Sequence, residues 1–522
     1  MDTQKYKIFE KLPESYWLSS TKATDYKALD RDIDVDIAIV GGGMVGISCA
    51  YELQKEGFKI AILEGGRIVQ NTTAHTTAKI TSQHNLIYDK LISQMGNELA
   101  QQYASANETA ITKIKKIAEE NNIDCDYISQ SAYVYAQSDE YLKKVEDEVK
   151  SAQSLGIKAS FTDKIPFNID IKGAVIFDNQ AQFHPRKYLL PLAEIIHNKG
   201  VRIYEQTRAM TLDEENGGYI IGTSQGKKVR AKQVIIASHY PFYNKHGMYF
   251  SRIYVNRDYI VAIKAKEKYP GGMYVNTEVP GRSLRHQNTE EGELILVVGE
   301  GHKTGQGEDT NNHYKALINF AEGIFTVEDI PYRWSTQDCM TLDGVPYIGH
   351  FTEDTPNLYI ATGFQKWGMT SSVVSSMIIR DLIVKGKSEY QDVYNPSRKT
   401  ITASAKEFVV QNANVASQLI SGKLSNNPEE FDIKPGKGKV VQVDGKRAGA
   451  YKDEEGKLYL VNTTCTHMGC ELNWNSAERS WDCPCHGSRF TVEGEVIEGP
   501  AVKPLSFSND VNTIEKLFKE DF

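Results

Sequence analysis

The sequence contains no run of about 18 apolar residues, the length that a helix needs in order to cross a membrane. Its first residues show neither a basic segment followed by an apolar stretch nor a twin-arginine pair. Lys and Arg number 60 against 68 Asp and Glu, so the net charge is -8 and no basic surplus is available for a polyanion. We therefore expect a cytoplasmic protein with no transmembrane segment and no nucleic acid as a partner.

Cysteine is also scarce, with 7 residues in a chain of 522, which excludes a disulfide-rich scaffold. Four of them lie close together near the C-terminus: Cys465, Cys470, Cys483 and Cys485. Such clustering indicates a local metal or redox site. The composition, 40% hydrophobic and 25% charged, is that of a globular protein, and at ~100–200 residues per domain the length allows two to four domains.

The N-terminal part opens with the pattern of a strand, a helix and a second strand. Residues 35–40 are apolar enough for a buried strand, 44–57 fit a helix, and 59–63 fit another strand. Later segments are expected to complete the same α/β unit, as strands at 201–204, 232–237 and 358–363 and as a buried helix at 369–385. Two polar segments with helical periodicity lie between, at about 97–122 and 140–155.

This pattern predicts an α/β fold in which an antiparallel β-rich region is inserted into a Rossmann-like domain, followed by a small all-β domain. The first domain is expected at 1–424, with dinucleotide-binding parts at about 34–90, 170–240 and 340–390 and a substrate region at about 240–335. A polar, turn-rich linker at 425–435 and a separate domain at 436–522 follow.

Two C-terminal loops space Cys and His as a metal centre would need them. Cys465-x-His467 and Cys483-x-x-His486 each offer one thiolate and one imidazole, the set for a centre with Cys ligands on one metal and His ligands on the other. The spacing favours a two-iron site. A mononuclear zinc site with two Cys and two His ligands is the alternative, and an iron assay separates the two.

The loops at 465–470 and 483–488 read Cys-x-His-x-Gly-Cys and Cys-x-Cys-His-Gly-Ser, and they closely resemble those of the Rieske 2Fe-2S proteins of cytochrome bc-type complexes. The resemblance implies four ligands, two thiolates on one iron and two imidazoles on the other: Cys465, Cys483, His467 and His486. It also implies a disulfide between Cys470 and Cys485 that ties the loops together.

Two positions near the second loop bear on the reduction potential. Ser488 matches a hydroxyl that donates to a bridging sulfide in high-potential relatives, whereas Phe490 stands where those relatives carry a Tyr. One hydrogen bond to a ligand sulfur is therefore missing. We expect a potential below that of respiratory Rieske proteins, within the general window of roughly -150 to +300 mV.

A glycine-rich turn follows the first strand and opens the first helix. Gly41, Gly43 and Gly46 have the G-x-G-x-x-G spacing that lets the backbone approach a pyrophosphate held at a helix N-terminus. Glu64 ends the second strand, where a carboxylate can accept hydrogen bonds from the hydroxyls of an adenosine ribose. The motif predicts a bound dinucleotide, but it does not distinguish NAD from FAD.

The early glycine motif and two late segments, 343–349 and 362–370, resemble the D-amino-acid oxidase and glycine oxidase superfamily, whose members bind FAD. The resemblance spans about residues 34–390. It implies FAD contacts, in addition to the glycines and Glu64, at Met44, Val45, Thr76, Gly363, Gly368, Met369 and Thr370. The helix that begins at 368 could stabilise the anion of the reduced flavin with its N-terminus, or it could be an ordinary buried helix.

The substrate site is the least determined part of the sequence. In the β-rich insertion, five side chains could bind a carboxylate or could serve only in packing or at the surface: Tyr259, Arg282, Arg285, His286 and Arg333. His75 and Lys79 follow the second strand, where they could touch the flavin ring or merely cap a helix.

A flavin accepts two electrons as a hydride and can release them singly, whereas an iron-sulfur cluster carries one electron at a time. The combination predicts a flavoprotein that oxidises a small substrate, with an amine or amino acid suggested by the resemblance, and passes single electrons to an external carrier. Two alternatives remain open: a reductase that takes electrons in through the cluster, and a redox relay or sensor that turns over no substrate.

Overall fold

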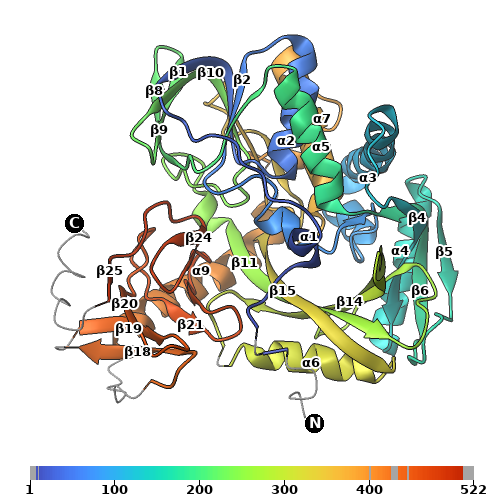
Figure 1. Cartoon of the computed structure of the whole chain (residues 1–522). Helices are drawn as coiled ribbons and strands as arrows, with labels where there is room; N and C mark the ends of the chain where they lie inside the picture. Colours follow the sequence, from blue (N-terminus) through green and yellow to red (C-terminus); the bar gives the residue numbers. More distant parts are fainter. Residues whose placement is uncertain are drawn as a thin grey trace.

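The computed structural model describes residues 8–9, 11–307, 309–398, 401–424, 433–443 and 446–509 (Figure 1). A sheet with helices packed on it lies at the top of Figure 1, a second and larger sheet at the lower right, and a small β-rich C-terminal domain at the lower left. Residues 425–432 of the expected linker lie outside the described residues.

The first sheet is mostly parallel and is built around the opening β-α-β unit. Its strands run in the order β16 (Tyr347–His350), β17 (Leu358–Thr362), β10 (Lys228–Ile236), β1 (Ile33–Val40), β2 (Ile60–Leu63) and β7 (Arg202–Tyr204). Strand β9 (Gly218–Thr223) pairs with β10, and β8 (Ala209–Glu215) pairs with β9. The expected return of 201–204 and 232–237 to this sheet is confirmed, since β7 pairs with β2 and β10 with β1.

Both faces of this sheet are buried along β2, β17 and the last residues of β1 and β10, which explains why these stretches are mostly apolar. Along β1, Ile37 and Ile39 pack with helices α2 (Met44–Leu53) and α7 (Gly368–Lys385), and Ala38 and Val40 enter a core on the opposite face. The short helix η2 (Gln54–Glu56) extends α2, and α5 (Pro185–Asn198) packs beside it. The expected helices at 44–57 and 369–385 are therefore present.

The second sheet is mixed. Its strands run in the order β15 (Val327–Thr341), β11 (Ile253–Ala265), β14 (Gly292–Lys303), β13 (Arg282–Thr289), β12 (Met273–Asn276), β4 (Ile128–Ala136), β6 (Gly173–Gln182) and β3 (Lys79–Ile80), with β5 (Ala159–Thr162) on β6. Helices α4 (Asp139–Ser154) and α6 (Asn311–Glu322) pack on this sheet, and α3 (Tyr88–Glu120) packs against α4 and α7.

The antiparallel insertion expected at 240–335 corresponds to β11–β15, but the sheet extends well beyond it. Strand β12 pairs with β4 in parallel, and β4 pairs with β6. Strand β6, which lies within the 170–240 segment expected to belong to the dinucleotide-binding part, is therefore a strand of the second sheet. The reason is a pairing between segments far apart in the chain, which periodicity along one segment does not reveal.

The C-terminal domain contains two small antiparallel sheets. One has the order β18 (Lys437–Val443), β19 (Lys446–Lys452), β20 (Leu458–Asn462) and β25 (Phe507–Ser508). The other has the order β21 (Asn473–Asn475), β22 (Ser480–Asp482), β23 (Arg489–Phe490) and β24 (Val496–Glu498). Helix α9 (Ile401–Leu424) precedes the domain and packs Val415 and Leu419 against its core.

Four short helices complete the described elements: α1 (Tyr16–Ser19), η3 (Thr72–Ala74), η4 (Tyr249–Ser251) and α8 (Gln391–Tyr394). Across the ranges that the structure describes, none of the helices combines the length and apolar character that a membrane crossing requires.

Candidate functional site

The glycine-rich turn between β1 and α2 needs glycine for two different reasons. Gly41 has a φ of +115°, and a Cβ placed on it would lie 2.4 Å from the carbonyl oxygen of Ala237. A Cβ on Gly46 would lie 2.0 Å from the carbonyl oxygen of Gly41, so Gly46 allows the helix to approach the turn closely. Gly43 instead borders a cavity, as the spacing predicts for a backbone that approaches a ligand.

Glu64 lies where β2 ends and faces the same cavity. One carboxylate oxygen accepts the N–H of Gly42 at 2.8 Å, and the other accepts the N–H of Gly66 at 2.9 Å. Burial raises the pKa of Glu64, and the two backbone donors oppose that shift. These contacts orient the carboxylate at the edge of the cavity, where it can accept from ribose hydroxyls.

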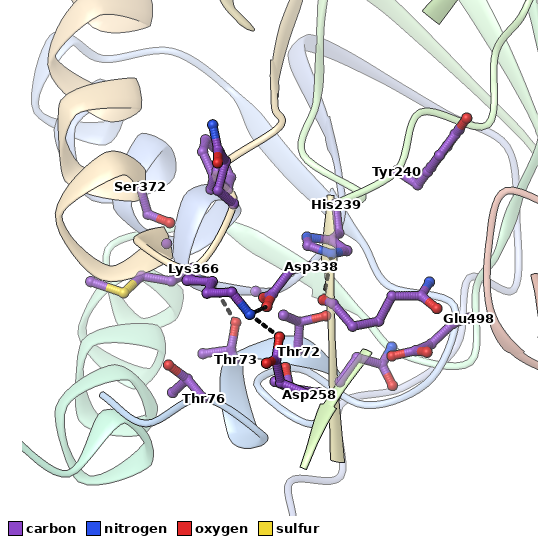
Figure 2. Close-up of a pocket in the computed structure, with 18 of the residues that line it drawn as sticks. Thr72, Thr73, Thr76, His239, Tyr240, Asp258, Asp338, Lys366, Ser372 and Glu498 are labelled. Carbon is purple, nitrogen blue, oxygen red and sulfur yellow. Dashed lines mark hydrogen bonds and ion pairs between the residues drawn. The ribbon is translucent and has the colours of Figure 1, made fainter. Parts of the chain in front are cut away.

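The cavity has a volume of about 620 Å³ and extends from the glycine turn to the start of α7 (Figure 2). Eight of the residues expected to contact FAD line it: Gly41, Gly43, Met44, Val45, Glu64, Thr76, Gly368 and Met369. The first N–H groups of α7 are among those that a helix leaves without an intrahelical acceptor, so this end presents partial positive charge to the cavity.

Three residues expected to contact FAD do not line the cavity: Gly46, Gly363 and Thr370. Gly363 has a φ of +74°, and a Cβ on it would lie 2.3 Å from Cγ2 of Thr341, so its glycine is required by packing. The hydroxyl of Thr370 donates to the carbonyl oxygen of Thr81 at 3.0 Å. Backbone conformation, close packing and internal hydrogen bonds therefore explain why these residues stand at these positions.

Lys366 and two acidic residues form a charged group in the cavity (Figure 2). Its ammonium contacts the carboxylate of Asp258 and lies 3.6 Å from that of Asp338. Burial disfavours the charge on Lys366, but the two carboxylates outweigh it and raise its pKa. Burial, together with Asp258, raises the pKa of Asp338. The two carboxylates therefore keep Lys366 protonated, and Asp338 is a carboxyl whose affinity for a proton is increased.

Lys79 is a second lysine on the cavity wall, with only 9% of its side chain exposed. Its ammonium donates to the hydroxyl of Ser283. Burial lowers the pKa of Lys79 to about 7, and the positive charges of Arg285 and Lys366 add to the shift. A lysine in this state can exchange a proton near neutral pH.

His75 was a candidate for contact with the flavin together with Lys79, but it does not line the cavity. It follows the short helix η3 (Thr72–Ala74), and its Nδ1 lies 2.8 Å from the carbonyl oxygen of Asn71. The helix-capping alternative therefore describes His75, and the cavity alternative describes Lys79.

Of the five candidates for carboxylate binding, Arg282 alone lines the cavity in the part of the chain that the structure describes. It also pairs with Glu300. The other four serve packing: Arg285 donates to the carbonyl oxygens of Thr77 and Ala78, Arg333 donates to those of Ile8 and Lys11, Tyr259 pairs with His302, and His286 is buried in the sheet.

Several cavity residues were not expected from the sequence: His239, Asp258, Gln337, Asp338, Lys366 and Glu498. Two of them could have been found from the sequence, because Asp258 and Asp338 lie inside long β-type segments. A charged residue is rarely buried without a partner, so an aspartate in such a segment indicates a buried charged site. Nothing local distinguishes Glu498 from other surface glutamates.

The two Cys-His loops meet in the C-terminal domain. Cys465 and Cys483 are buried and lie within hydrogen-bonding reach of each other, a contact that lowers the pKa of Cys465 and raises that of Cys483. The rings of His467 and His486 are 5.0 Å apart, and in both the Nδ1 atom is buried without a hydrogen-bond partner. Two adjacent thiols and two orphaned ring nitrogens are a donor set that fits a metal centre.

Cys470 and Cys485 form a disulfide, as the sequence analysis expected. Their sulfur atoms and that of Cys483 lie within 4.8 Å of one another, but the bonded pair is not available as thiolate ligands. The hydroxyl of Ser488 accepts the N–H of Ala501 at 3.0 Å and lowers the pKa of Cys465. Phe490 is fully buried in the same core and offers no hydroxyl.

The cavity and the loops are joined by direct contacts. Gln337, on β15, lines the cavity and donates to the carbonyl oxygen of Gly487 at 3.0 Å. The side-chain amide of Asn244 lies 2.8 Å from Nε2 of His467. Residues 496–502 of the C-terminal domain line the cavity as well. The two predicted cofactor sites therefore adjoin within one chain.

Comparison with known proteins agrees with both halves of the site. Residues 36–382 match the family described as FAD dependent oxidoreductase, and residues 427–514 match the Rieske 2Fe-2S domain. YhfW of Bacillus subtilis, named as a Rieske 2Fe-2S iron-sulfur protein, is 44% identical over 494 residues, which cover 94% of this chain and 97% of that protein.

Two further relatives match the N-terminal part. The γ-glutamylputrescine oxidoreductase of Escherichia coli is 24% identical over 409 residues, which cover 73% of this chain and 90% of the relative. The crystal structure of glycine oxidase from Geobacillus kaustophilus superposes with a TM-score of 0.61 at 18% identity and covers 70% of this chain and 99% of that one, which shows a shared fold.

The expected fold class and the expected cofactors, FAD and a 2Fe-2S cluster, are thus confirmed. Because the first family covers well over half of the sequence and the second covers its C-terminal end, the chain belongs to the FAD-dependent oxidoreductases and carries a Rieske 2Fe-2S domain.

Proposed function

We propose that the protein oxidises a small amine or amino acid at FAD and passes the electrons, one at a time, through its own Rieske cluster to an external carrier. The observation that carries the proposal is the junction of the two sites: the cavity that begins at the glycine turn is also lined by the C-terminal domain, and Gln337 connects it to the second cluster loop. The name of the E. coli relative, a γ-glutamylputrescine oxidoreductase, supports a substrate with an amine.

FAD supplies the two-electron acceptor that can afterwards give up electrons singly. The glycine turn, Glu64 and the start of α7 would hold it, and Cys465, Cys483, His467 and His486 would hold the cluster. Loss of a hydride from carbon and a proton from nitrogen converts an amine to an imine, which water hydrolyses to a carbonyl compound and a released amine or ammonia.

The side chains of the cavity provide for the proton and for binding. Lys79, with a pKa of about 7, can accept the proton of a substrate ammonium at Nζ when it is neutral. Arg282 can attract the carboxylate of an amino acid, and Glu300 beside it keeps the guanidinium in place. Asp258 contacts Lys366 in the same cavity.

Anaerobic rapid mixing with a panel of amines and amino acids tests the direction of flow. We expect the flavin absorbance to bleach before that of the cluster. The proposal would be overturned in favour of a reductase if two results were obtained together: no substrate bleaches the flavin, and a reduced one-electron carrier bleaches the cluster first. If neither centre bleaches with any compound, the relay interpretation replaces it.

A variant without the cluster tests the exit route. In Cys465→Ser/Cys483→Ser, the flavin should still bleach with substrate, while reduction of cytochrome c by the protein should fall at least tenfold. Because cytochrome c accepts single electrons, an unchanged rate would show that electrons leave from the flavin directly.

A further inference from the structure

A segment of the C-terminal domain runs along one wall of the FAD cavity. Strand β24 and the turn after it, residues 496–502, line the cavity together with the glycine turn. At one end, the carbonyl oxygen of Val496 accepts from Arg208 at 3.1 Å. Arg208 packs against Gly65, the residue that follows Glu64: a Cβ placed on Gly65 would lie 3.3 Å from the guanidinium carbon of Arg208. This end of the segment therefore lies next to the carboxylate suited to a ribose.

The other end is fixed by Glu498. Its Oε2 accepts from Arg257 of β11 at 2.6 Å and from Arg489 of β23 at 3.2 Å. Arg257 and Arg489 are 1% and 7% exposed, so the three groups form a buried ionic bridge between the domains. Burial opposes the charge on Glu498, but Arg257 and then Arg489 outweigh it and lower its pKa to about 2. The carboxylate is therefore ionised at any ordinary pH.

The same side chain is part of the cavity wall (Figure 2). Further contacts seat the domain on β15 and α6, in addition to Gln337 with Gly487: Arg333 with Ala477, Thr310 with Asn475, and Tyr314 with Glu478. The wall thus belongs to an extensive polar interface. Removal of one partner from a buried ion pair leaves the other charge uncompensated, so Glu498 is the point at which this wall can be weakened specifically.

We propose that the Rieske domain forms part of the FAD-binding site, and that Glu498 is the positioning residue that holds residues 496–502 against the cofactor. A ligand that contacts both domains stabilises their docked arrangement, and docking in turn strengthens its binding by the same factor. FAD affinity accordingly depends on a domain that is not part of the FAD-dependent oxidoreductase match, which ends at residue 382.

The test uses the full chain with its cluster in place and FAD removed, and it measures the Kd of FAD by quenching of flavin fluorescence. In Glu498→Gln we expect the Kd to rise at least tenfold and FAD to dissociate faster. Glu493→Gln is the matched control, because Glu493 is an exposed carboxylate of the same domain that does not line the cavity. Its Kd should stay within twofold of the wild type.

A Glu498→Gln variant with a wild-type cluster spectrum and a Kd within twofold of the wild type would overturn the proposal. Should that variant lose its cluster, hydrogen exchange of the wild-type chain decides instead. Addition of FAD should protect the backbone amides of residues 496–499, 501 and 502 at least tenfold, and unchanged exchange there would overturn the proposal. Neither readout involves a substrate, so failure of this proposal is distinguishable from failure of the proposed oxidation.

Discussion

Replacement of Lys79 by Met should make the protein more stable and less active. In the native state, burial lowers the pKa of Lys79 from 10.5 to about 7, while in the unfolded chain it returns to its ordinary value. Between these two values the unfolded state binds the extra proton, so stability rises with pH. The penalty from this lysine is complete below about pH 7 and is gone above about pH 10.5.

Each pH unit inside that window changes the free energy of unfolding by about 1.4 kcal/mol. The wild type should therefore lose roughly 2 to 3 kcal/mol of stability between pH 9 and pH 7 through this one group. Lys79→Met has no titrating group at this position, so its stability lacks this dependence on pH. Methionine fills a similar space in a site where only 9% of the residue is exposed. Its advantage over the wild type should be largest at pH 7 and below.

Urea unfolding of the FAD-loaded wild type and of Lys79→Met at pH 6, 7, 8 and 9 measures this difference. The exposed Lys143→Met is the control, and its stability should follow the wild type at each pH. In parallel, the kcat/KM of the wild type for an amine should fall about fivefold from pH 7 to pH 6, because the neutral fraction of Lys79 falls from about one half to about one eleventh. A stability difference between Lys79→Met and wild type that does not change with pH would refute the reasoning about burial.

The remaining predictions concern the two cofactor sites. Glu64→Gln should weaken FAD about tenfold in fluorescence titration, because a charged acceptor for ribose hydroxyls is lost, whereas the exposed Glu56→Gln should not. Phe490→Tyr should raise the midpoint potential of the cluster by roughly 40 mV in voltammetry. This value assumes that the added hydroxyl donates a hydrogen bond that is about 1 kcal/mol stronger in the reduced state, and 59 mV corresponds to a tenfold change for one electron. An unchanged midpoint potential would contradict this prediction. Cys470→Ser/Cys485→Ser should destabilise the C-terminal domain by about 3 kcal/mol, as expected for a closed loop of this length, and should release iron at a lower temperature.

Local patterns in the sequence located most elements of the first sheet. The strand at 35–40, the helix from Met44 and the strand at 59–63 appear close to the expected bounds. The two strands are largely apolar, because the centre of a parallel sheet is buried on both faces. The second sheet was predicted in part. Its strands β4 and β6 come from sequence that precedes the inserted region, and their pairing with β12 depends on contacts between distant segments.

The candidate site divides in the same way. The glycine turn and the two Cys-His loops are local motifs, in which backbone conformation and ligand spacing operate over a few residues, so sequence alone could locate them. Gly363 and Thr370 show the limit, since both lie in a segment that resembles the family, yet one packs against Thr341 and the other bonds to Thr81. Which member of a motif faces a cavity depends on the packing around it.

By itself the sequence determined a dinucleotide site, a Cys-His metal site and the order of the two domains, because each of these motifs consists of residues a few positions apart, and family resemblance then indicated FAD and a 2Fe-2S cluster. Only the tertiary structure decided what surrounds them. Lys79, Asp338 and Lys366 come from three separate segments of the chain, and their pKa values are shifted by burial and by neighbouring charges that the fold brings close. The wall at 496–502 exists only because the C-terminal domain docks on β11 and β15, and charge pairing across that interface has no signature in a local pattern of residues.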